Sequence, residues 1–195
     1  NTNHKNNGDQ NIIITDLDGD NDGDIITSTS GNGVEWYEYT GSGNFSSHTI
    51  TTTFNNNNTI QVDAADLDGD SDIDIIATGQ DGLNWYQNDG SENFTEKTIS
   101  SITNKIQSAI TIADFDDDND LDIASSIEYN GFDIYINDGS ENFTKTNIND
   151  DKDIRTIQSA DFDGDGDIDI VTGSRGPGGG GEGTIDLWDN QFIYN

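Results

Sequence analysis

The stretch DLDGDSDIDII, residues 66–76, places five aspartates at alternate positions and then runs into an apolar segment. Two carboxylates about 4 Å apart repel each other by roughly 4 kcal/mol at an effective dielectric constant near 20. We therefore expect a cation among them. Carboxylates at loop positions one, three, five and nine, with the backbone carbonyl at position seven, suit a hard cation that takes six to eight oxygen ligands.

The acidic motif occurs four times, as DLDGDNDGD at 16–24, DLDGDSDID at 66–74, DFDDDNDLD at 114–122 and DFDGDGDID at 161–169. Successive copies begin 50, 48 and 47 residues apart. Self-similarity at such a period predicts a repeat architecture in which each unit is one supersecondary element. We interpret residues 1–195 as a single repeat domain, with units at about 12–59, 60–105, 106–153 and 154–195.

Each unit predicts four short strands. The chain has 26 Ile against 5 Leu, and β-branched side chains favour strands. An apolar run enters the acidic loop, a second run leaves it, and a third strand carries two adjacent large residues, as in VEWYEY, LNWYQN, FDIYIN and IDLWDN. A fourth strand begins at Phe45, Phe94 and Phe143, after Asn-Asp-Gly turns at 88–90 and 137–139 in the middle units.

These strands predict an all-β fold, a β-propeller-type repeat array of four four-stranded blades. The fourth unit lacks a full fourth strand, so its blade is expected to be incomplete. The units could form a small closed ring or an arc of a larger propeller, and a solenoid is the main competing architecture.

The charge and residue content of the chain limit its binding partners and its cellular location. A formal net charge of −32 disfavours nucleic acid and anionic membranes as partners. Without cysteine no disulfide stabilises the fold, and no apolar run is long enough to insert into a membrane. Because the chain also contains no Met, we interpret it as a processed, exported product and expect a secreted or cell-surface location.

The donor atoms favour calcium. Zinc and copper prefer His or Cys, and the chain has two His and no Cys, whereas magnesium demands a rigid octahedron. An EF-hand would need Glu at loop position twelve and flanking helices. That position holds Thr27, Ala77, Ser125 and Thr172 instead, so we expect about four Ca²⁺ ions, one in each acidic loop.

The DxDGDxDxD pattern between strands, with its NDGxxxF turns, resembles the FG-GAP/VCBS repeats of integrin-α-like β-propellers from Ile12 to Trp188. The resemblance implies calcium loops that brace the blades, with the carbonyl at position seven as a further ligand. A departure is Asp117, where the other units have glycine. The implied side-chain ligands are Asp16, Asp18, Asp20, Asp24, Asp66, Asp68, Asp70, Asp74, Asp114, Asp116, Asp118, Asp122, Asp161, Asp163, Asp165 and Asp169. The implied carbonyls are those of Asp22, Asp72, Asp120 and Asp167, whose side chains we expect to face solvent.

We do not expect an enzyme, because the only histidines, His4 and His48, lie in no triad pattern. The expected function is that of an extracellular binding or adhesion module for a protein or carbohydrate, with Tyr129 and Arg175 as candidate ligand-binding residues on loops. One alternative is a structural segment of a surface protein or filament that self-associates through its incomplete fourth unit. Another is an accessory domain of a carbohydrate-active enzyme.

Four Asn-x-Ser/Thr sequons occur, at Asn44, Asn57, Asn93 and Asn142. Three of them precede a Phe at the same repeat position, so turn geometry explains them as well as glycosylation does.

Overall fold

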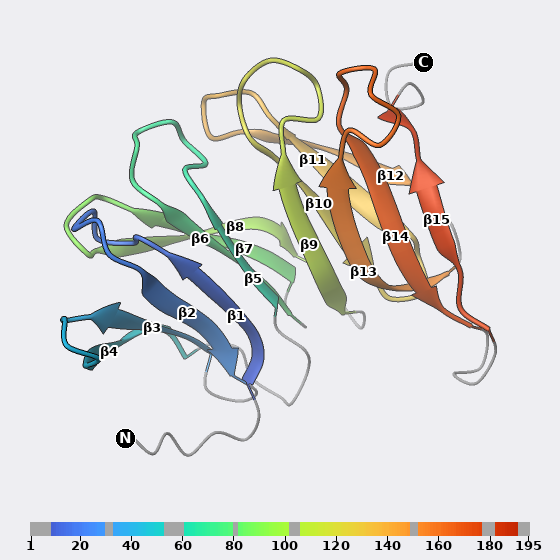
Figure 1. The fold of residues 1–195 in the computed structure, drawn as a ribbon. Coiled ribbons are helices and arrows are strands. Elements are labelled where there is room, and N and C mark those ends of the chain that lie inside the picture. The colour runs from blue at the N-terminus through green and yellow to red at the C-terminus, as the bar shows by residue number, and fades with distance from the viewer. Residues whose placement is uncertain are drawn as a thin grey trace. The chain divides into compact units, whose positions relative to one another are not determined.

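The computed structural model describes residues 9–29, 33–52, 61–79, 82–101, 106–148, 152–176 and 182–190. Within this part the chain is all-β and forms four antiparallel sheets, one for each sequence repeat (Figure 1). Three sheets have four strands and the last has three. The predicted fold class and the incomplete fourth unit are therefore confirmed.

The strands of each sheet follow one another in chain order. The first sheet contains β1 (Asp9–Thr15), β2 (Asp24–Thr29), β3 (Gly33–Tyr39) and β4 (Phe45–Thr51). The second contains β5 (Gln61–Ala65), β6 (Asp74–Gly79), β7 (Gly82–Asn88) and β8 (Phe94–Ser101). The third contains β9 (Gln107–Ala113), β10 (Asp122–Ile127), β11 (Phe132–Asn137) and β12 (Phe143–Ile148). The fourth contains β13 (Asp153–Ala160), β14 (Asp169–Arg175) and β15 (Ile185–Trp188).

The third strands of the middle sheets are buried on both faces. In β7 the adjacent Trp85 and Tyr86 are each 1% exposed, and in β11 Ile134 and Tyr135 are equally inaccessible. Because successive side chains of a strand point to opposite faces, both faces of these strands are covered. Sequential antiparallel sheets of four strands that are covered in this way have the organisation of propeller blades.

The chain divides into two compact units, each built on two sheets. The first comprises residues 1–66 and 71–106, and its core packs Ile26, Val34 and Trp36 of the first sheet with Ile75 and Tyr86 of the second. The second comprises residues 67–70 and 107–195.

The core of the second unit repeats this arrangement with Phe132 and Ile134 of the third sheet and Ile170 and Trp188 of the fourth. The Phe132 and Trp188 rings meet edge to face, with their centroids 5.3 Å apart. Among the described residues, no helix is long and apolar enough to cross a membrane.

Candidate metal centres

Each acidic loop joins the first and second strands of its sheet, and each brings three carboxylates together. In every loop one oxygen from each of three aspartates lies within 4.8 Å of the others. The triads are Asp16, Asp18 and Asp24; Asp66, Asp68 and Asp70; Asp114, Asp116 and Asp122; and Asp161, Asp163 and Asp169. The regularly spaced aspartates of the sequence thus come together in four local clusters of carboxylate oxygens.

The first aspartate of each loop accepts hydrogen bonds from backbone amides later in the same loop. Asp16 accepts hydrogen bonds from the Gly19 amide at 2.8 Å and from the Asn21 amide at 2.9 Å. Asp66 and Asp114 accept from Ser71 and Asn119 in the same way, each at 2.9 Å. These Asx-type bonds join residues of one loop and fix its backbone.

Two loop positions need left-handed backbone. Position four has φ values of 79°, 77° and 82° at Gly19, Gly69 and Gly164, and 63° at Asp117. Position six is also left-handed, at Asn21, Ser71, Asn119 and Gly166. Left-handed backbone at positions four and six therefore lets the aspartate side chains at alternate loop positions turn toward one point.

The ninth aspartate is buried and ties the loop to its sheet. Asp122 is fully buried and accepts hydrogen bonds from the Phe115 and Asn137 amides, each at 2.8 Å. Asp24 does the same with Leu17 at 3.1 Å and Tyr39 at 2.8 Å. One carboxylate thus serves the triad, the loop and the end of the third strand together.

The side chain of the seventh aspartate packs against a turn glycine in two loops, which the sequence did not indicate. We expected these side chains to face solvent, and Asp167 is exposed. In contrast, the Asp72 and Asp120 carboxylates lie against the α-carbons of Gly90 and Gly139, where an added Cβ would collide with them. The glycine of each Asn-Asp-Gly turn is therefore required by this close approach as well as by its positive φ.

Burial and neighbouring charges raise the pKa values of several loop aspartates. Burial, followed by the Asp118 charge, raises the pKa of Asp116, and the Asp165 charge raises the pKa of Asp167. Burial raises the pKa of Asp122 to about 6, against the opposing effect of its two amide donors. A divalent cation would offset both the burial of these carboxylates and the repulsion between them.

The donor set fits calcium. Asp22 Oδ1 and Asp116 Oδ1 are buried acceptors with no hydrogen-bond donor. Every candidate ligand in the four triads is a carboxylate oxygen, which hard cations prefer, and the loops have the backbone turns to bring further oxygens inward. The aspartates named above would hold Ca²⁺, and the ion would supply the charge that the carboxylates lack.

An asparagine at the end of the third strand links successive repeats. Asn88 Nδ2 donates to the Leu17 carbonyl at 3.1 Å, and Asn137 Nδ2 donates to the Leu67 carbonyl at 2.9 Å. Asn190 Nδ2 donates to the Phe115 carbonyl at 2.8 Å. Each acceptor is position two of the preceding acidic loop. We did not predict this role, although the repeated Asn at one position was a visible signal.

The sequon asparagines before Phe are turn residues. Asn93 Nδ2 donates to both oxygens of Asp89, at 3.2 and 3.0 Å, and to the Ser91 carbonyl. Asn142 makes the same bonds to Asp138 and Ser140. The hydrogen bond from Asn93 is the main reason that the pKa of Asp89 lies below its usual value. Turn geometry therefore explains these asparagines.

The candidate ligand-binding residues lie on the second unit. Tyr129 is 59% exposed in the turn between β10 and β11 and has a positive φ of 53°. Arg175 is exposed at the end of β14, and the following glycine-rich segment 177–181 lies outside the described residues. Both residues are accessible, and their role stays a prediction.

Comparison with known proteins matches this chain to one family. The profile of the FG-GAP-like repeat matches residues 16–77, 66–125 and 114–172. No curated protein matches the chain. Among solved structures, one similar fold is that of an Agrocybe aegerita lectin described as recognising non-reducing terminal N-acetylglucosamine, with a TM-score of 0.58 and 20% identity. The match covers 90% of this chain and 51% of the lectin chain, so the chain spans about half the length of that structure.

Proposed function

Because the chain belongs to the FG-GAP-like repeat family, we propose that it is a calcium-stabilised, extracellular binding module of the β-propeller type that recognises a glycan. The observation that carries this proposal is the set of four carboxylate triads at one position of every repeat. In such a repeat the aspartates of the acidic loop would stabilise the fold through calcium, and the other loops would be available to bind a ligand.

Calcium has a structural role in this proposal. In the first, third and fourth loops the ninth aspartate belongs to the triad and also accepts amides from the loop and from the end of the third strand. An ion bound there would couple these elements, because its ligands would be ordered together. Free Ca²⁺ at the millimolar level found outside cells suits sites with dissociation constants of about 0.1 to 1 mM.

The glycan part of the proposal is supported by the fold shared with the Agrocybe aegerita lectin. Tyr129 offers an exposed aromatic ring, 59% accessible, of the kind that can stack on the apolar face of a sugar. Arg175 offers hydrogen-bond donors for hydroxyl or acidic groups. The proposed activity is non-catalytic: the described loops would bind and present, and no bond would be broken.

The test is a glycan array probed with the intact chain in millimolar calcium, with EDTA as the control. We expect selective binding, with terminal N-acetylglucosamine among the first glycans to examine, and loss of that binding in EDTA. Tyr129→Ala should weaken binding, while Leu187→Ala, another exposed apolar residue, should not. A blank array from a folded, calcium-bound sample would contradict the glycan proposal.

A second candidate function is a structural segment that assembles with other copies. The fourth repeat exposes Phe162 (54%) in its acidic loop and Ile185 (83%) and Leu187 (55%) on β15, and apolar surface of this kind can be covered by another copy. Analytical ultracentrifugation over a range of concentrations distinguishes the two functions, because only the assembly model predicts oligomers that grow with concentration.

A further inference from the structure

In the second unit, a turn of the third sheet and the start of the fourth sheet bring four polar side chains together. The turn between β10 and β11 presents Glu128 and Tyr129. The strand β13 supplies Asp153 and Arg155. Arg155 Nη2 donates to Asp153 Oδ2 at 2.6 Å and lies 3.7 Å from Glu128 Oε1. The hydrogen bond to Asp153 raises the pKa of Arg155, and Glu128 and Tyr129 add to this effect. We call these four residues the turn cluster.

Asp153 forms the base of the turn cluster. Its side chain is 4% exposed, whereas the side chain of Arg155 is 36% exposed and covers it. Within the described part of the chain, Asp153 Oδ1 is a buried acceptor without a donor, and Arg155 Nε is a buried donor without an acceptor. Most buried polar atoms are hydrogen-bonded, because an unsatisfied one costs stability. The two members of this ion pair therefore leave one acceptor and one donor for a group from outside the fold.

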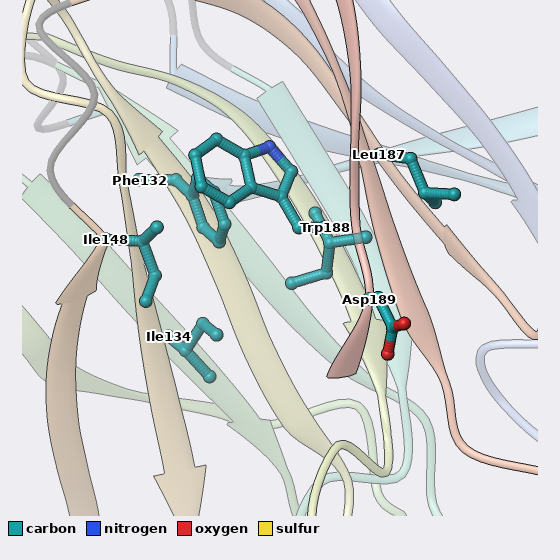
Figure 2. Close-up of a pocket in the computed structure, with 7 residues that line it drawn as sticks. Phe132, Ile134, Ile148, Leu187, Trp188 and Asp189 are labelled. Carbon is teal, nitrogen blue, oxygen red and sulfur yellow. The ribbon is translucent and has the colours of Figure 1, made fainter. Parts of the chain in front are cut away.

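The turn that carries Glu128 and Tyr129 is fixed at both ends. The Ile127 amide donates to the Gly131 carbonyl at 2.9 Å, and the Asn130 amide donates to the Ile127 carbonyl at 3.0 Å. Phe132 follows the turn and is 1% exposed. Figure 2 shows its ring beside the Trp188 ring in the wall of an apolar pocket. The turn is thus held before any ligand binds.

The backbone of β13 is fixed as well. Ile154, between the two charged residues, is fully buried, and its carbonyl accepts a hydrogen bond from Ser108 Oγ at 3.2 Å. The register of β13 against β14 shifts between Ile154 and Thr156, so Arg155 is the extra residue of a bulge. Bulges occur often beside binding sites, where they redirect a side chain.

Tyr129 is placed at a conformational cost. Its φ is 53°, a left-handed value that is uncommon for a bulky residue, and its side chain is 59% exposed. An exposed ring gains little from packing, so packing does not compensate for this backbone. Strained residues of this kind cluster at ligand sites.

The repeat itself does not require the charged pair. Counted back from the first aspartate of the acidic loop, the positions of Asp153 and Arg155 hold Ile106 and Ser108 in the third repeat. The chain has only two arginines, Arg155 and Arg175, and Arg175 pairs with Asp153 across β13 and β14. Cross-strand partners lie on one face of a sheet, so both arginines are next to this carboxylate.

The charges of this group select a neutral ligand. Two guanidinium groups stand against the carboxylates of Asp153 and Glu128, so the four charges sum to zero. An acidic ligand would compete with both carboxylates for Arg155, and the net charge of −32 would repel it. A hydroxyl group matches the unused atoms, because it can donate one hydrogen bond and accept another.

We propose that the turn cluster is the sugar-binding site of the module and that it takes a neutral sugar. One hydroxyl would donate to Asp153 Oδ1 and accept from Arg155 Nε, while the sugar ring stacks on Tyr129. The exposed Arg155 side chain would turn aside to admit the hydroxyl. This assignment rests on the proposed glycan-binding function and adds its residues and its preference for uncharged sugars.

The test uses the intact chain in saturating calcium on an array that carries each neutral glycan beside its sialylated or uronic-acid counterpart. We expect selected neutral glycans to bind, and their acidic counterparts to bind no better. Asp153→Asn should weaken binding of the best neutral glycan roughly 10- to 100-fold, as expected for loss of a hydrogen bond to a charged group. Arg155→Lys keeps a cation beside Asp153 but lacks Nε, and it should also weaken binding.

Asp133→Asn is the matched control. Asp133 is a fully buried carboxylate that pairs with the partly exposed Lys145, as Asp153 pairs with Arg155. Its neighbour Phe132 packs into the core with the fourth sheet, so Asp133 points to the opposite face of β11. Asp133→Asn should therefore keep wild-type glycan binding. Circular dichroism and the melting temperature in calcium show whether each variant folds.

Monodeoxy forms of the best neutral glycan identify the bound hydroxyl. The form that lacks this hydroxyl should bind the wild-type protein roughly 10- to 100-fold more weakly than the full glycan does. It should bind Asp153→Asn no more weakly than the full glycan does, because that variant has already lost the same hydrogen bond.

The site and the glycan function fail in different ways. A blank array from a folded, calcium-bound wild-type protein would overturn both. Glycan binding that Asp153→Asn leaves at the wild-type level, or that Asp133→Asn weakens equally, would overturn only the assignment to the turn cluster. Stronger binding of the acidic counterparts would overturn the preference for a neutral sugar.

Discussion

Asp117 holds a backbone conformation that its three sister loops give to glycine. Its φ is 63°, and left-handed backbone costs a residue with a Cβ about 1 kcal/mol, somewhat less for Asp. In the sister loops a Cβ on Gly19, Gly69 or Gly164 would meet nothing within 4 Å, so the cost at this position is conformational and not steric.

We therefore predict that Asp117→Gly stabilises the protein by about 0.5 to 1 kcal/mol. The change also removes a charge that raises the pKa of Asp167. Urea denaturation in saturating calcium measures the difference. Gly19→Asp is the reverse control and should destabilise by a similar amount, and a stabilising Gly19→Asp would refute the conformational explanation.

Asp63 is an isolated carboxylate on β5. It accepts the Ala64 amide at 2.9 Å, but burial raises its pKa above the usual value. The folded state therefore binds the proton more tightly than the unfolded state does. The stability contributed by protonated Asp63 is complete below the unfolded pKa near 4 and is lost as the pH rises through the folded pKa.

Asp63→Asn should consequently raise the melting temperature at pH 7, with a gain that disappears as the pH falls toward 4. Thermal melts of both proteins across this range supply the measurement. Asp89→Asn serves as the opposite case, because hydrogen bonds from Asn93 and nearby amides lower the pKa of Asp89. A gain for Asp63→Asn that is the same at every pH would contradict the assignment to this carboxylate.

At the scale of the elements, the asparagine at the end of the third strand connects each sheet to the loop before it. Asn88 Nδ2 donates to the carbonyls of Leu17 and Ile73, each at 3.1 Å. Asn88 is 2% exposed, so water cannot readily replace either bond.

Asn88→Ala should therefore destabilise the protein by about 2 to 3 kcal/mol, the cost of leaving buried acceptors without a donor. Asn93→Ala is the control, because its hydrogen bonds to Asp89 and Ser91 lie in an exposed turn, and its cost should stay below about 1 kcal/mol. Chemical denaturation compares the two variants. Equal losses would show that the turn, and not the link between elements, determines the effect.

Sequence reasoning predicted the loops better than the links between them. Alternating aspartates and the strands on either side of them are local patterns, and the four clusters and four sheets follow those patterns closely. Asn88 and Asn137 looked like turn residues, since Asn-Asp-Gly is a turn signal. Their bonds to residues about 70 positions away could not be deduced from that local role.

At the scale of the whole molecule, the chain carries a net charge of −32, which bound calcium partly neutralises. Calcium binding is the largest single contribution to stability that we propose. Sites with dissociation constants of about 0.1 to 1 mM each add roughly 1.4 kcal/mol at tenfold excess of free calcium. Four independent sites would add about 5 to 6 kcal/mol, comparable to the total of roughly 5 to 15 kcal/mol that holds a domain together.

Removal of calcium should accordingly lower the melting temperature by tens of degrees or unfold the chain, as measured by circular dichroism before and after EDTA. Equimolar magnesium should restore little of the lost stability, because it favours a rigid octahedron of ligands and retains its water.

The fourth loop should bind calcium most weakly, since Asp161, Asp163 and Asp165 are all exposed, whereas Asp114 and Asp116 of the third loop are half-buried. Asp116→Asn should therefore cost more calcium-dependent stability than Asp163→Asn does, and the reverse order would show that burial does not rank these sites.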